Sequence, residues 1–302
     1  MTNTSFEKLA NLFGMRSRDF FLLIKNPSIY YCDYTIPKRN GGVRHISSPT
    51  LQLMAIQREI LKQILLPKFK APSCCAGFVK NKNIIDNVKP HLKKIYILKM
   101  DVKDFFPSIK QQQVQKLFET LEYSKKVSSI LARLCCRYGS IPQGAPTSPI
   151  LSNMVMQTVD EKIVQLCDNY NFAYTRYADD ITISSNNEIK PDIAFQIQNF
   201  LAEDGFEVKK EKTHFYGKNS KKIITGVSIS SGVPKLPRTT KRAWHQEIMM
   251  IKKHGILGHM DNISNYNPIF IASMLGKISF WKQIEPDNPF LYEASLILKK
   301  AI

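Results

Sequence analysis

The chain has 302 residues, of which 43 are Lys or Arg and 25 are Asp or Glu, so its formal net charge is +18 at pH 7. This length allows two or three subdomains around a sizeable core, and so large a positive charge is typical of a protein with a polyanionic partner, although a generally solubilising surface is the simpler alternative. The chain has no run of about 20 apolar residues, no apolar signal-peptide core and no C-x-x-C pair, so we expect a cytoplasmic protein with reduced thiols, no membrane contact and no zinc site of the usual spacing.

The N-terminal third of the chain predicts helices and one hairpin. We expect a helix over 4–26, a hairpin over 29–47 that turns at Asn40-Gly41-Gly42, and a second helix over 51–66. The stretch 71–91 is rich in loop-forming residues and is expected to contain at least one helical turn.

The rest of the chain alternates apolar strands with helices. An apolar strand over 95–100 runs into Asp101, and two aromatic residues with a proline turn follow it. Helices are expected over 111–138 and 149–169, with a Pro-Gln-Gly loop between them. Downstream we expect a helix over 191–204, a strand over 223–229, and a basic helical region from residue 237 to the end.

Two adjacent carboxylates, Asp179 and Asp180, lie between two short apolar runs rich in β-branched residues. This pattern predicts a β-hairpin with Ala-Asp-Asp at its tip. Like charges at such close range repel each other unless a divalent cation lies between them. Asp is also common in solvated turns, so this segment alone is compatible with both a turn and a metal site.

The strand that ends at Asp101 adds a third carboxylate. Together with the hairpin tip it would form a cluster of the kind that holds two Mg²⁺ ions, which bind the attacking and leaving oxygens of a displacement reaction. We expect Asp101 and Asp179 to be ligands and Asp180 to be a weaker or outer one, with Val102 also at the metal site. Asp104 is expected to cap a turn.

At these acidic segments the chain resembles the palm of a reverse transcriptase. The run from Asp101 to Phe106 resembles the first catalytic motif of that family, and Tyr177-Ala178-Asp179-Asp180 resembles its YADD signature. Three further segments resemble family motifs in the expected order: Ile36-Pro37-Lys38 with Arg44-His45-Ile46, Ile141 to Pro149, and Gly205-Phe206 with Lys212-Thr213. The resemblance covers about residues 30 to 280.

This resemblance implies an α+β right-hand polymerase fold with an antiparallel palm sheet backed by helices. We expect N-terminal helices and fingers over 1–95, a palm over 96–234 with a fingers insertion at about 110–140, and a helical, basic thumb over 235–302.

The resemblance also assigns residues to the deoxynucleoside triphosphate (dNTP). Lys38 and Arg44 would contact the triphosphate, as a point charge and a forked donor respectively, and Phe106 would exclude ribonucleotides at the sugar 2′ position. Gln143 and Gly144 would lie along the nascent base pair. Simpler alternatives stay open: an exposed basic hairpin, a core aromatic residue and an ordinary turn.

Lys212 matches a family lysine that can protonate the leaving pyrophosphate. General acid catalysis needs such a positioned donor. Its neighbours Lys209, Lys210 and Glu211 also give this stretch the appearance of a solvated surface, so the catalytic role and the surface role both remain open.

Two shorter segments resemble motifs of retron reverse transcriptases. Asn87-Val88-Lys89-Pro90-His91 resembles N-A-x-x-H, with valine in place of alanine, and Ile224-Thr225-Gly226 resembles V-T-G, with isoleucine in place of valine. A surface histidine in a loop and a strand that ends at glycine are the simpler alternatives. The residues implied to bind RNA are Asn87, His91, Thr225, Gly226, and Lys241 and Arg242 of the thumb.

A retron enzyme would reverse-transcribe part of its own structured noncoding RNA (msr-msd), starting from the 2′-hydroxyl of an internal guanosine, and would produce the branched RNA–DNA called msDNA. The implied substrates are dNTPs, the implied cofactor is two Mg²⁺ ions, and the implied further partner is an effector protein of anti-phage defence. Another bacterial reverse transcriptase (intron-derived or a standalone defence enzyme), a non-catalytic RNA-binding scaffold on a polymerase fold, and an RNA-directed RNA polymerase are the alternatives, and Phe106 argues against the last.

Overall fold

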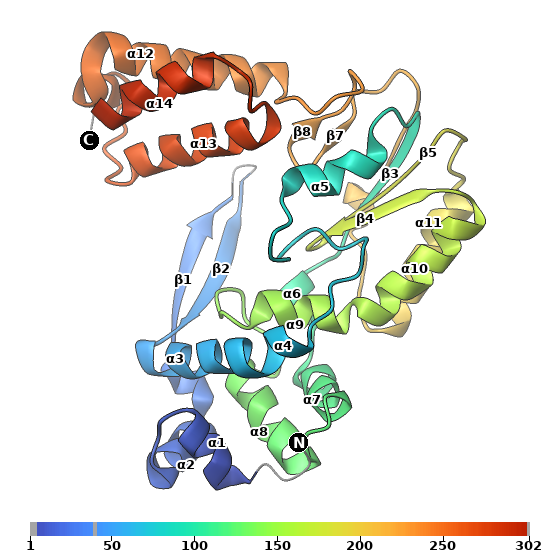
Figure 1. Ribbon diagram of the computed structural model, residues 1–302, viewed down its shortest axis with the longest axis vertical. Coiled ribbons are helices and arrows are strands. Elements are labelled where there is room, and N and C mark those ends of the chain that lie inside the picture. The colour runs from blue at the N-terminus through green and yellow to red at the C-terminus, as the bar shows by residue number, and fades with distance from the viewer. Residues whose placement is uncertain (1–4, 39–40, 301–302) are drawn as a thin grey trace.

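The computed structural model describes residues 5–38 and 41–300. Helices surround a small central sheet, a two-stranded hairpin rises beside it, and three C-terminal helices form a separate layer above (Figure 1). This mixed architecture agrees with the expected α+β class. No helix in the described ranges is both long and apolar enough to cross a bilayer.

The N-terminus forms two short helices, α1 (Phe6–Leu12) and α2 (Ser17–Lys25), followed by the 3₁₀ turn η1 (Pro27–Tyr30). The helical character expected over 4–26 is therefore confirmed in the described part, as two helices with a turn between them. The chain turns at Gly14, which has a φ of +64°, a conformation that glycine adopts at little cost.

The expected hairpin is confirmed. Strand β1 (Tyr31–Pro37) pairs antiparallel with β2 (Val43–Pro49), and Ile36 lies opposite Arg44. Asn40 of the expected turn lies outside the described residues, whereas Gly41 and Gly42 both have positive φ, which explains the need for glycine there.

The next helix begins at Leu51 as expected. It runs as α3 (Leu51–Glu59), a π-helical segment η2 (Ile60–Leu65) and the final turn α4 (Leu66–Lys68). The loop-rich stretch that follows contains α5 (Ile84–Val88) and the 3₁₀ turn η3 (Lys89–His91).

Each of the two long helices expected in the middle of the chain is a pair of helices. The stretch 111–138 contains α7 (Gln111–Thr120) and α8 (Lys125–Cys135), which are separated where Glu122 has a φ of 68°. The stretch 149–169 contains α9 (Ser148–Val155) and α10 (Gln157–Asn169). The shorter elements nearby are α6 (Phe105–Ser108), α11 (Pro191–Glu203) and the 3₁₀ turn η4 (Lys210–Lys212).

The central sheet has the strand order β4-β5-β3-β6, with antiparallel neighbours throughout. Its strands are β3 (Tyr96–Asp101), β4 (Ala173–Tyr177), β5 (Asp180–Ser185) and β6 (His214–Tyr216). Strands β3 and β5 are almost entirely buried, since the hydrophobic core includes Leu98, Met100, Ile181 and Ile183 together with residues of the covering helices α9, α10 and α11. The sheet is therefore a rigid platform for whatever lies at its strand ends.

The strand expected over 223–229 is instead a small hairpin. Strand β7 (Ile223–Ile224) turns through Thr225 and Gly226 into β8 (Val227–Ser228). Both turn residues have positive φ, 45° and 85°, as the tight turns of two-residue hairpins require. A positive φ at Thr225 is uncommon for a β-branched residue.

The C-terminal layer consists of α12 (Arg238–Asn262), kinked at Gly255, α13 (Phe270–Ile284) and α14 (Phe290–Lys300). These helices share a second hydrophobic core with α5 and the β7–β8 hairpin, so this part of the core extends across the residue-235 boundary that the sequence suggested. Trp281 is fully buried in it.

Candidate active site

A cleft of about 610 Å³ lies between the β1–β2 hairpin and the end of the central sheet. Six residues singled out in the sequence line it together: Lys38, Arg44, Phe106, Gln143, Asp179 and Lys212. These residues come from segments spread over 175 positions of the chain, so the fold brings the expected phosphate-binding, sugar-contacting and acidic groups into one cavity.

Strand register determines where the acids lie. Asp101 is the last residue of β3 and lies directly opposite Asp180, the first residue of β5. The backbone N–H of Val102 donates to the carbonyl oxygen of Asp179 at 3.0 Å. The backbones of the three acids therefore lie together at one end of the two central strands, as the sequence predicted.

Two lysines hold the carboxylate of Asp101. Lys209 Nζ lies 2.6 Å from Oδ1, and Lys212 Nζ lies 2.7 Å from Oδ2. The hydrogen bond to Asp101 raises the pKa of Lys212 above its ordinary value, which keeps this ammonium group protonated. Lys209 was missed in the sequence, where it looked like part of a solvated lysine run.

The other two carboxylates are more difficult to ionise than a free aspartate. Burial raises the pKa of Asp179, and the charge of Asp101 adds to this. Burial and then the charge of Asp179 raise the pKa of Asp180 to about 6. These shifts are the expected result of placing like charges together in a half-buried site, and nearby positive charge relieves them.

Phe106 and its neighbour Phe105 both line the cleft, although Phe105 is buried. The Phe106 ring packs against Phe105, with 5.6 Å between centroids, and against Phe78, with 6.1 Å. Phe78 also lines the cleft and is 42% exposed. Phe106 is itself partly buried against the core, so its role at the sugar stays a prediction, and Phe78 is a cleft residue that the sequence reasoning did not find.

A backbone hydrogen bond and close packing join the β1–β2 hairpin to the loop that carries Gln143. The N–H of Ser47 donates to the Gln143 carbonyl at 2.8 Å, and a Cβ on Gly144 would lie 2.9 Å from the Ser47 carbonyl oxygen. Gly144 is not among the lining residues of the cleft. Its contribution in the structure is close packing against the hairpin, so the expected position along a base pair stays a prediction.

A buried arginine that lines the cleft makes a further contact with the β1–β2 hairpin. Arg137 makes an ion pair with Asp33 of β1 and lies over the rings of Tyr31 and Tyr138, 5.1 and 4.7 Å from their centroids. Tyr138 is 80% exposed and lines the cleft. Neither Arg137 nor Tyr138 belongs to a motif that the sequence reasoning used.

The two retron-like motifs lie next to each other. The side-chain amide of Asn87 donates to Thr225 Oγ1 at 3.2 Å. His91 is completely buried, with Nδ1 2.7 Å from Ser184 Oγ and Nε2 2.7 Å from Thr175 Oγ1. The surface alternative for His91 was wrong.

Burial also corrects the expected RNA contacts. The side chains of Asn87 and His91 are at most 1% exposed, so they cannot reach RNA in this structure. They join η3 and the β7–β8 turn to the central sheet instead. Thr225 is half-buried and Gly226 is exposed, so the turn itself remains accessible.

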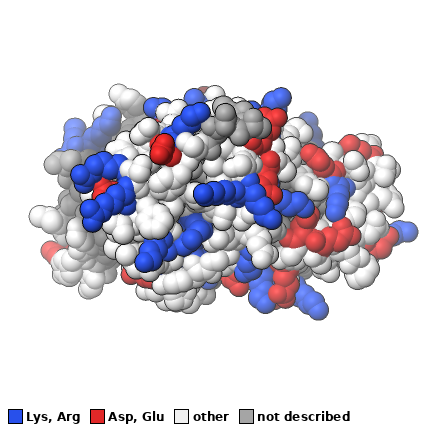
Figure 2. Space-filling model, turned by 90° about the horizontal axis from the view of Figure 1, so that it is seen from below, with Lys and Arg blue, Asp and Glu red and all other residues white. Residues whose placement is uncertain are grey.

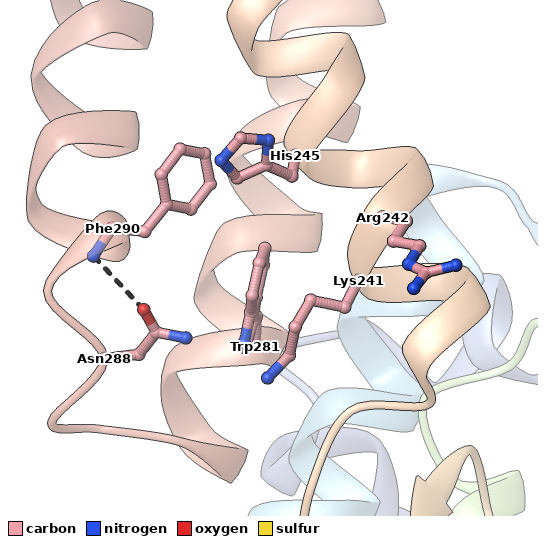
Figure 3. Close-up of a pocket in the computed structure, with 6 residues that line it drawn as sticks. All are labelled: Lys241, Arg242, His245, Trp281, Asn288 and Phe290. Carbon is pink, nitrogen blue, oxygen red and sulfur yellow. Dashed lines mark hydrogen bonds between the residues drawn. The ribbon is translucent and has the colours of Figure 1, made fainter.

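A shallow pocket of about 360 Å³ in the C-terminal layer contains both expected thumb cations (Figure 3). Lys241 donates to Glu285 Oε2 at 2.7 Å and lies 5.6 Å from the ring centroid of Trp281, so its charge is already paired. Arg242 is exposed. The His245 ring stacks on Phe290 across the same pocket, with centroids 4.2 Å apart.

The excess of positive charge is not spread evenly over the surface. On the face seen in Figure 2, acidic side chains gather toward one side and basic ones are interspersed with uncharged areas. This face therefore does not present a uniform polycationic coat.

The family model described as reverse transcriptase (RNA-dependent DNA polymerase) matches residues 36–229. The chain belongs to this family. A telomerase from Candida albicans, solved in complex with a fragment of telomeric RNA, has the same type of fold, with a TM-score of 0.51 and 13% identity over 90% of this chain and 63% of that one. The architecture is thus the right-hand polymerase fold that the sequence predicted.

Among its relatives, this family member is similar to the retron Ec86 reverse transcriptase of Escherichia coli, with 34% identity over 69% of this chain and 66% of that protein. It is 32% identical to the retron Mx65 reverse transcriptase of Myxococcus xanthus, over 78% of this chain and 60% of the relative. The retron Ec83 reverse transcriptase of Escherichia coli is 31% identical, over 89% of this chain and 88% of that protein. The match therefore spans about two thirds or less of the first two relatives and most of the third.

Reverse transcriptase domains generally use divalent metal ions, so the acidic cluster of this family member can be tested for fit. Within residues 5–38 and 41–300, no three His, Cys, Asp or Glu side chains are grouped closely enough to hold a metal as they stand. Both oxygens of Asp101 face lysines instead. The donors themselves fit, because Mg²⁺ prefers carboxylate oxygens, and because Asp179 and Asp180, whose pKa values are raised first by burial and then by a neighbouring carboxylate, would be favoured in their ionised form by a cation.

Metal binding would require Asp101 to exchange its lysine partners for the ion. The four expected ligands, Asp101, Val102, Asp179 and Asp180, then remain a prediction, with Val102 able to contribute only its backbone carbonyl. The two lysine ammonium groups already show that cationic charge is favourable beside Asp101.

The burial of His91 predicts a specific pH dependence of stability. Burial, with the charge of Lys94, lowers the pKa of His91 from 6.5 to about 3. The unfolded state therefore binds one more proton between these values, and stability falls as the pH drops below 6.5. At pH 5 the contribution of His91 to stability should be about 2 kcal/mol smaller than at pH 7.5. The raised pKa of Asp180 acts in the opposite direction over this range, so the effect of His91 is measured as the difference between the wild type and a His91 variant.

Urea unfolding at pH 7.5 and pH 5 measures this loss. The His91→Gln variant should lose less of its unfolding free energy on acidification than the wild type, whereas His254→Gln, a change at an exposed histidine, should follow the wild type. An equal pH dependence in all three proteins would contradict the prediction.

Proposed function

We propose that the chain is an RNA-directed DNA polymerase of a retron, which acts in the cytoplasm. The observation that carries the proposal is a single cleft that is lined by Asp179 and Lys212, by the hairpin residues Lys38 and Arg44, and by Phe106. Membership of the reverse transcriptase family and the similarity to retron reverse transcriptases support the choice of template and product.

The residues of the cleft are suited to hold a dNTP against a primer end. Lys38 and Arg44 supply positive charge for the triphosphate, and Arg44 can form forked contacts to phosphate oxygens. The ring of Phe106, supported by Phe105 and Phe78, would occupy the space of a sugar 2′-hydroxyl. Tyr138 forms part of the cleft wall near Gln143.

The acids would act on the reacting oxygens through two Mg²⁺ ions, which when bound supply a lowered pKa for the attacking hydroxyl and neutralise developing charge. Asp101 at the end of β3, Asp180 at the start of β5 and the adjacent Asp179 would hold these ions. Lys212 is protonated and lies at the cleft, so it can donate a proton to the leaving pyrophosphate. Before the ions bind, Lys209 can hold Asp101 in the same orientation from its other oxygen.

The proposed template is a cognate structured noncoding RNA (msr-msd), copied from an internal guanosine 2′-hydroxyl into branched msDNA. RNA of this kind is recognised through shape, 2′-hydroxyls and unpaired bases. The exposed Arg242 and the β7–β8 turn with Thr225 and Gly226 are accessible for such contacts. Lys241 is paired with Glu285 beside Trp281, and it would contribute to RNA binding through the pocket that these residues form. An effector protein of anti-phage defence is the proposed further partner.

The direct test is co-expression with the noncoding region that flanks the gene, followed by extraction of nucleic acid from the purified protein. The wild type should yield a short DNA that a debranching enzyme releases from its RNA. An Asp179→Asn, Asp180→Asn double variant should yield none while it still retains RNA, because the change removes charge from the cluster without removing bulk.

Three results separate the alternatives. Linear complementary DNA without a branch would leave a reverse transcriptase and contradict the retron assignment. Bound RNA without DNA, and no synthesis on added primer-template with Mg²⁺ and dNTPs, would favour an RNA-binding scaffold. Equal DNA yields from the wild type and the double variant would contradict the assigned acids.

The sugar-gate role of Phe106 makes a separate prediction. Phe106→Ala should raise the incorporation of ribonucleotides relative to deoxyribonucleotides by at least about 10-fold, because the removed ring opens space at the 2′ position and a contact of this size is worth on the order of 1–3 kcal/mol. Single-nucleotide extension with dTTP and UTP measures the ratio. Phe118→Leu is the control, since Phe118 is fully buried and does not line the cleft, and an unchanged ratio in Phe106→Ala would remove the gate assignment.

A further inference from the structure

The segment Cys74 to Phe78 lies beside the catalytic hairpin although it is about 100 positions away in sequence. Cys75 forms a parallel bridge with Arg176 of β4. The N–H of Arg176 donates to the Cys74 carbonyl at 2.8 Å, and the N–H of Ala76 donates to the Arg176 carbonyl at 2.9 Å. The segment thus adds a short edge to the sheet and ends under the hairpin tip.

Gly77 makes the closest contact with that tip. A Cβ on Gly77 would lie 2.6 Å from the backbone nitrogen of Ala178 and 3.1 Å from the carbonyl carbon of Tyr177. Both atoms belong to the backbone and cannot rotate away. The φ of Gly77 lies outside the left-handed range, so alanine could adopt its conformation and only this contact opposes a side chain.

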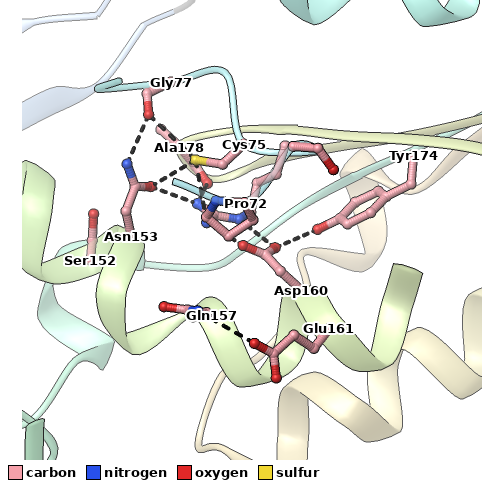
Figure 4. A network of polar contacts seen from close by, with 12 residues as sticks. Pro72, Cys75, Gly77, Ser152, Asn153, Gln157, Asp160, Glu161, Tyr174 and Ala178 are labelled. Atoms are coloured by element: carbon pink, nitrogen blue, oxygen red, sulfur yellow. Dashed lines mark hydrogen bonds and ion pairs between the residues drawn. The ribbon is translucent and has the colours of Figure 1, made fainter. Parts of the chain in front are cut away.

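A buried charge network also holds the same tip (Figure 4). The Arg176 guanidinium donates to Asp160 at 2.8 and 2.6 Å, and Tyr174 donates to the same carboxylate at 2.7 Å. Arg176 Nη1 also donates to the Ala178 carbonyl at 3.2 Å and to Asn153 Oδ1 at 3.1 Å. Arg176 has no exposed surface, so this arrangement is held in place by packing.

Asn153 connects this network to Gly77. Its side-chain amide donates to the Gly77 carbonyl at 2.9 Å, so the tip and the segment beneath it are tied to one residue of α9. The residue between them, Ala178, has a φ of 58°. A left-handed conformation is uncommon for a residue other than glycine and persists only where the surroundings hold it.

We propose that Gly77 and Arg176 are positioning residues of the catalytic hairpin, and that together with Asn153 they hold Ala178 in its left-handed conformation and so direct Asp179 into the cleft. The inference rests on the proposed polymerase function. It assigns to Gly77 a role that depends on the absence of a side chain, since any Cβ would push the tip and the following carboxylate away from Asp101.

The test compares Gly77→Ala with Gly276→Ala, a change in α13 where a Cβ meets no atom within 4 Å. Extension of oligo(dT) on poly(rA) with dTTP gives kcat and KM. Gly77→Ala should lower kcat on the order of 100-fold, as expected for a displacement of about 1 Å in a reacting group, with KM for dTTP within about twofold of the wild type. Gly276→Ala should match the wild type in both.

A second readout does not depend on turnover. The rise in melting temperature that Mg²⁺ alone produces in the wild type should be reduced in Gly77→Ala and unchanged in Gly276→Ala. Asn153→Ala gives an independent variant, which removes the link to Gly77 without adding atoms and leaves the Arg176–Asp160 pair intact. It should lower kcat in the same direction, again with KM unchanged.

The outcomes are distinguishable. The inference would be overturned if Gly77→Ala showed the same kcat and the same Mg²⁺-dependent melting shift as Gly276→Ala. A loss of activity that appeared in KM alone would also overturn it. If Gly77→Ala fails to fold, Asn153→Ala decides in the same two measurements. Failure of the wild type to extend the primer would count against the proposed function, while the Mg²⁺-dependent melting shift would still test the positioning of the tip.

Discussion

The antiparallel pairing of β3 with β5 is the constraint on which the site depends. Its register places Asp101 opposite Asp180, and a shift by one residue would turn every side chain of a strand to the other face. The buried faces of both strands prevent such a shift, because Leu98, Ile181 and Ile183 would have to leave the core. Core packing therefore fixes the position of the carboxylates.

Charge balance follows from that register. Three acids at the same end of the two central strands repel each other. Burial, and then this repulsion, raises the pKa values of Asp179 and Asp180. Lys209 and Lys212 form ion pairs with the two carboxylate oxygens of Asp101 and so offset part of the negative charge. A polymerase site needs the same balance, since its substrate brings further negative charge and its ions bring positive charge.

Several side chains around the cleft act as internal supports. His91 and Asn87 join η3, the central sheet and the β7–β8 turn through bonds to Ser184, Thr175 and Thr225. Motif residues of this kind can be essential without contact to a ligand, because a shift of the sheet edge would move the acids. The β7–β8 turn and the exposed Arg242 of α12, by contrast, remain accessible on the surface.

The sequence by itself determined the polymerase class, the β1–β2 hairpin and the acids, because these depend on local patterns: apolar strands that end in Asp, a glycine turn and cations on either side of it. Only the tertiary structure decided that His91 is buried, that Lys209 binds Asp101 and that Gly77 lies under Ala178. Breaks such as those at Gly14 and Glu122, which divided two expected helices, depend on single backbone angles that apolar periodicity does not record. Contacts between residues about 100 positions apart depend on strand order and register, which only the packed core fixes.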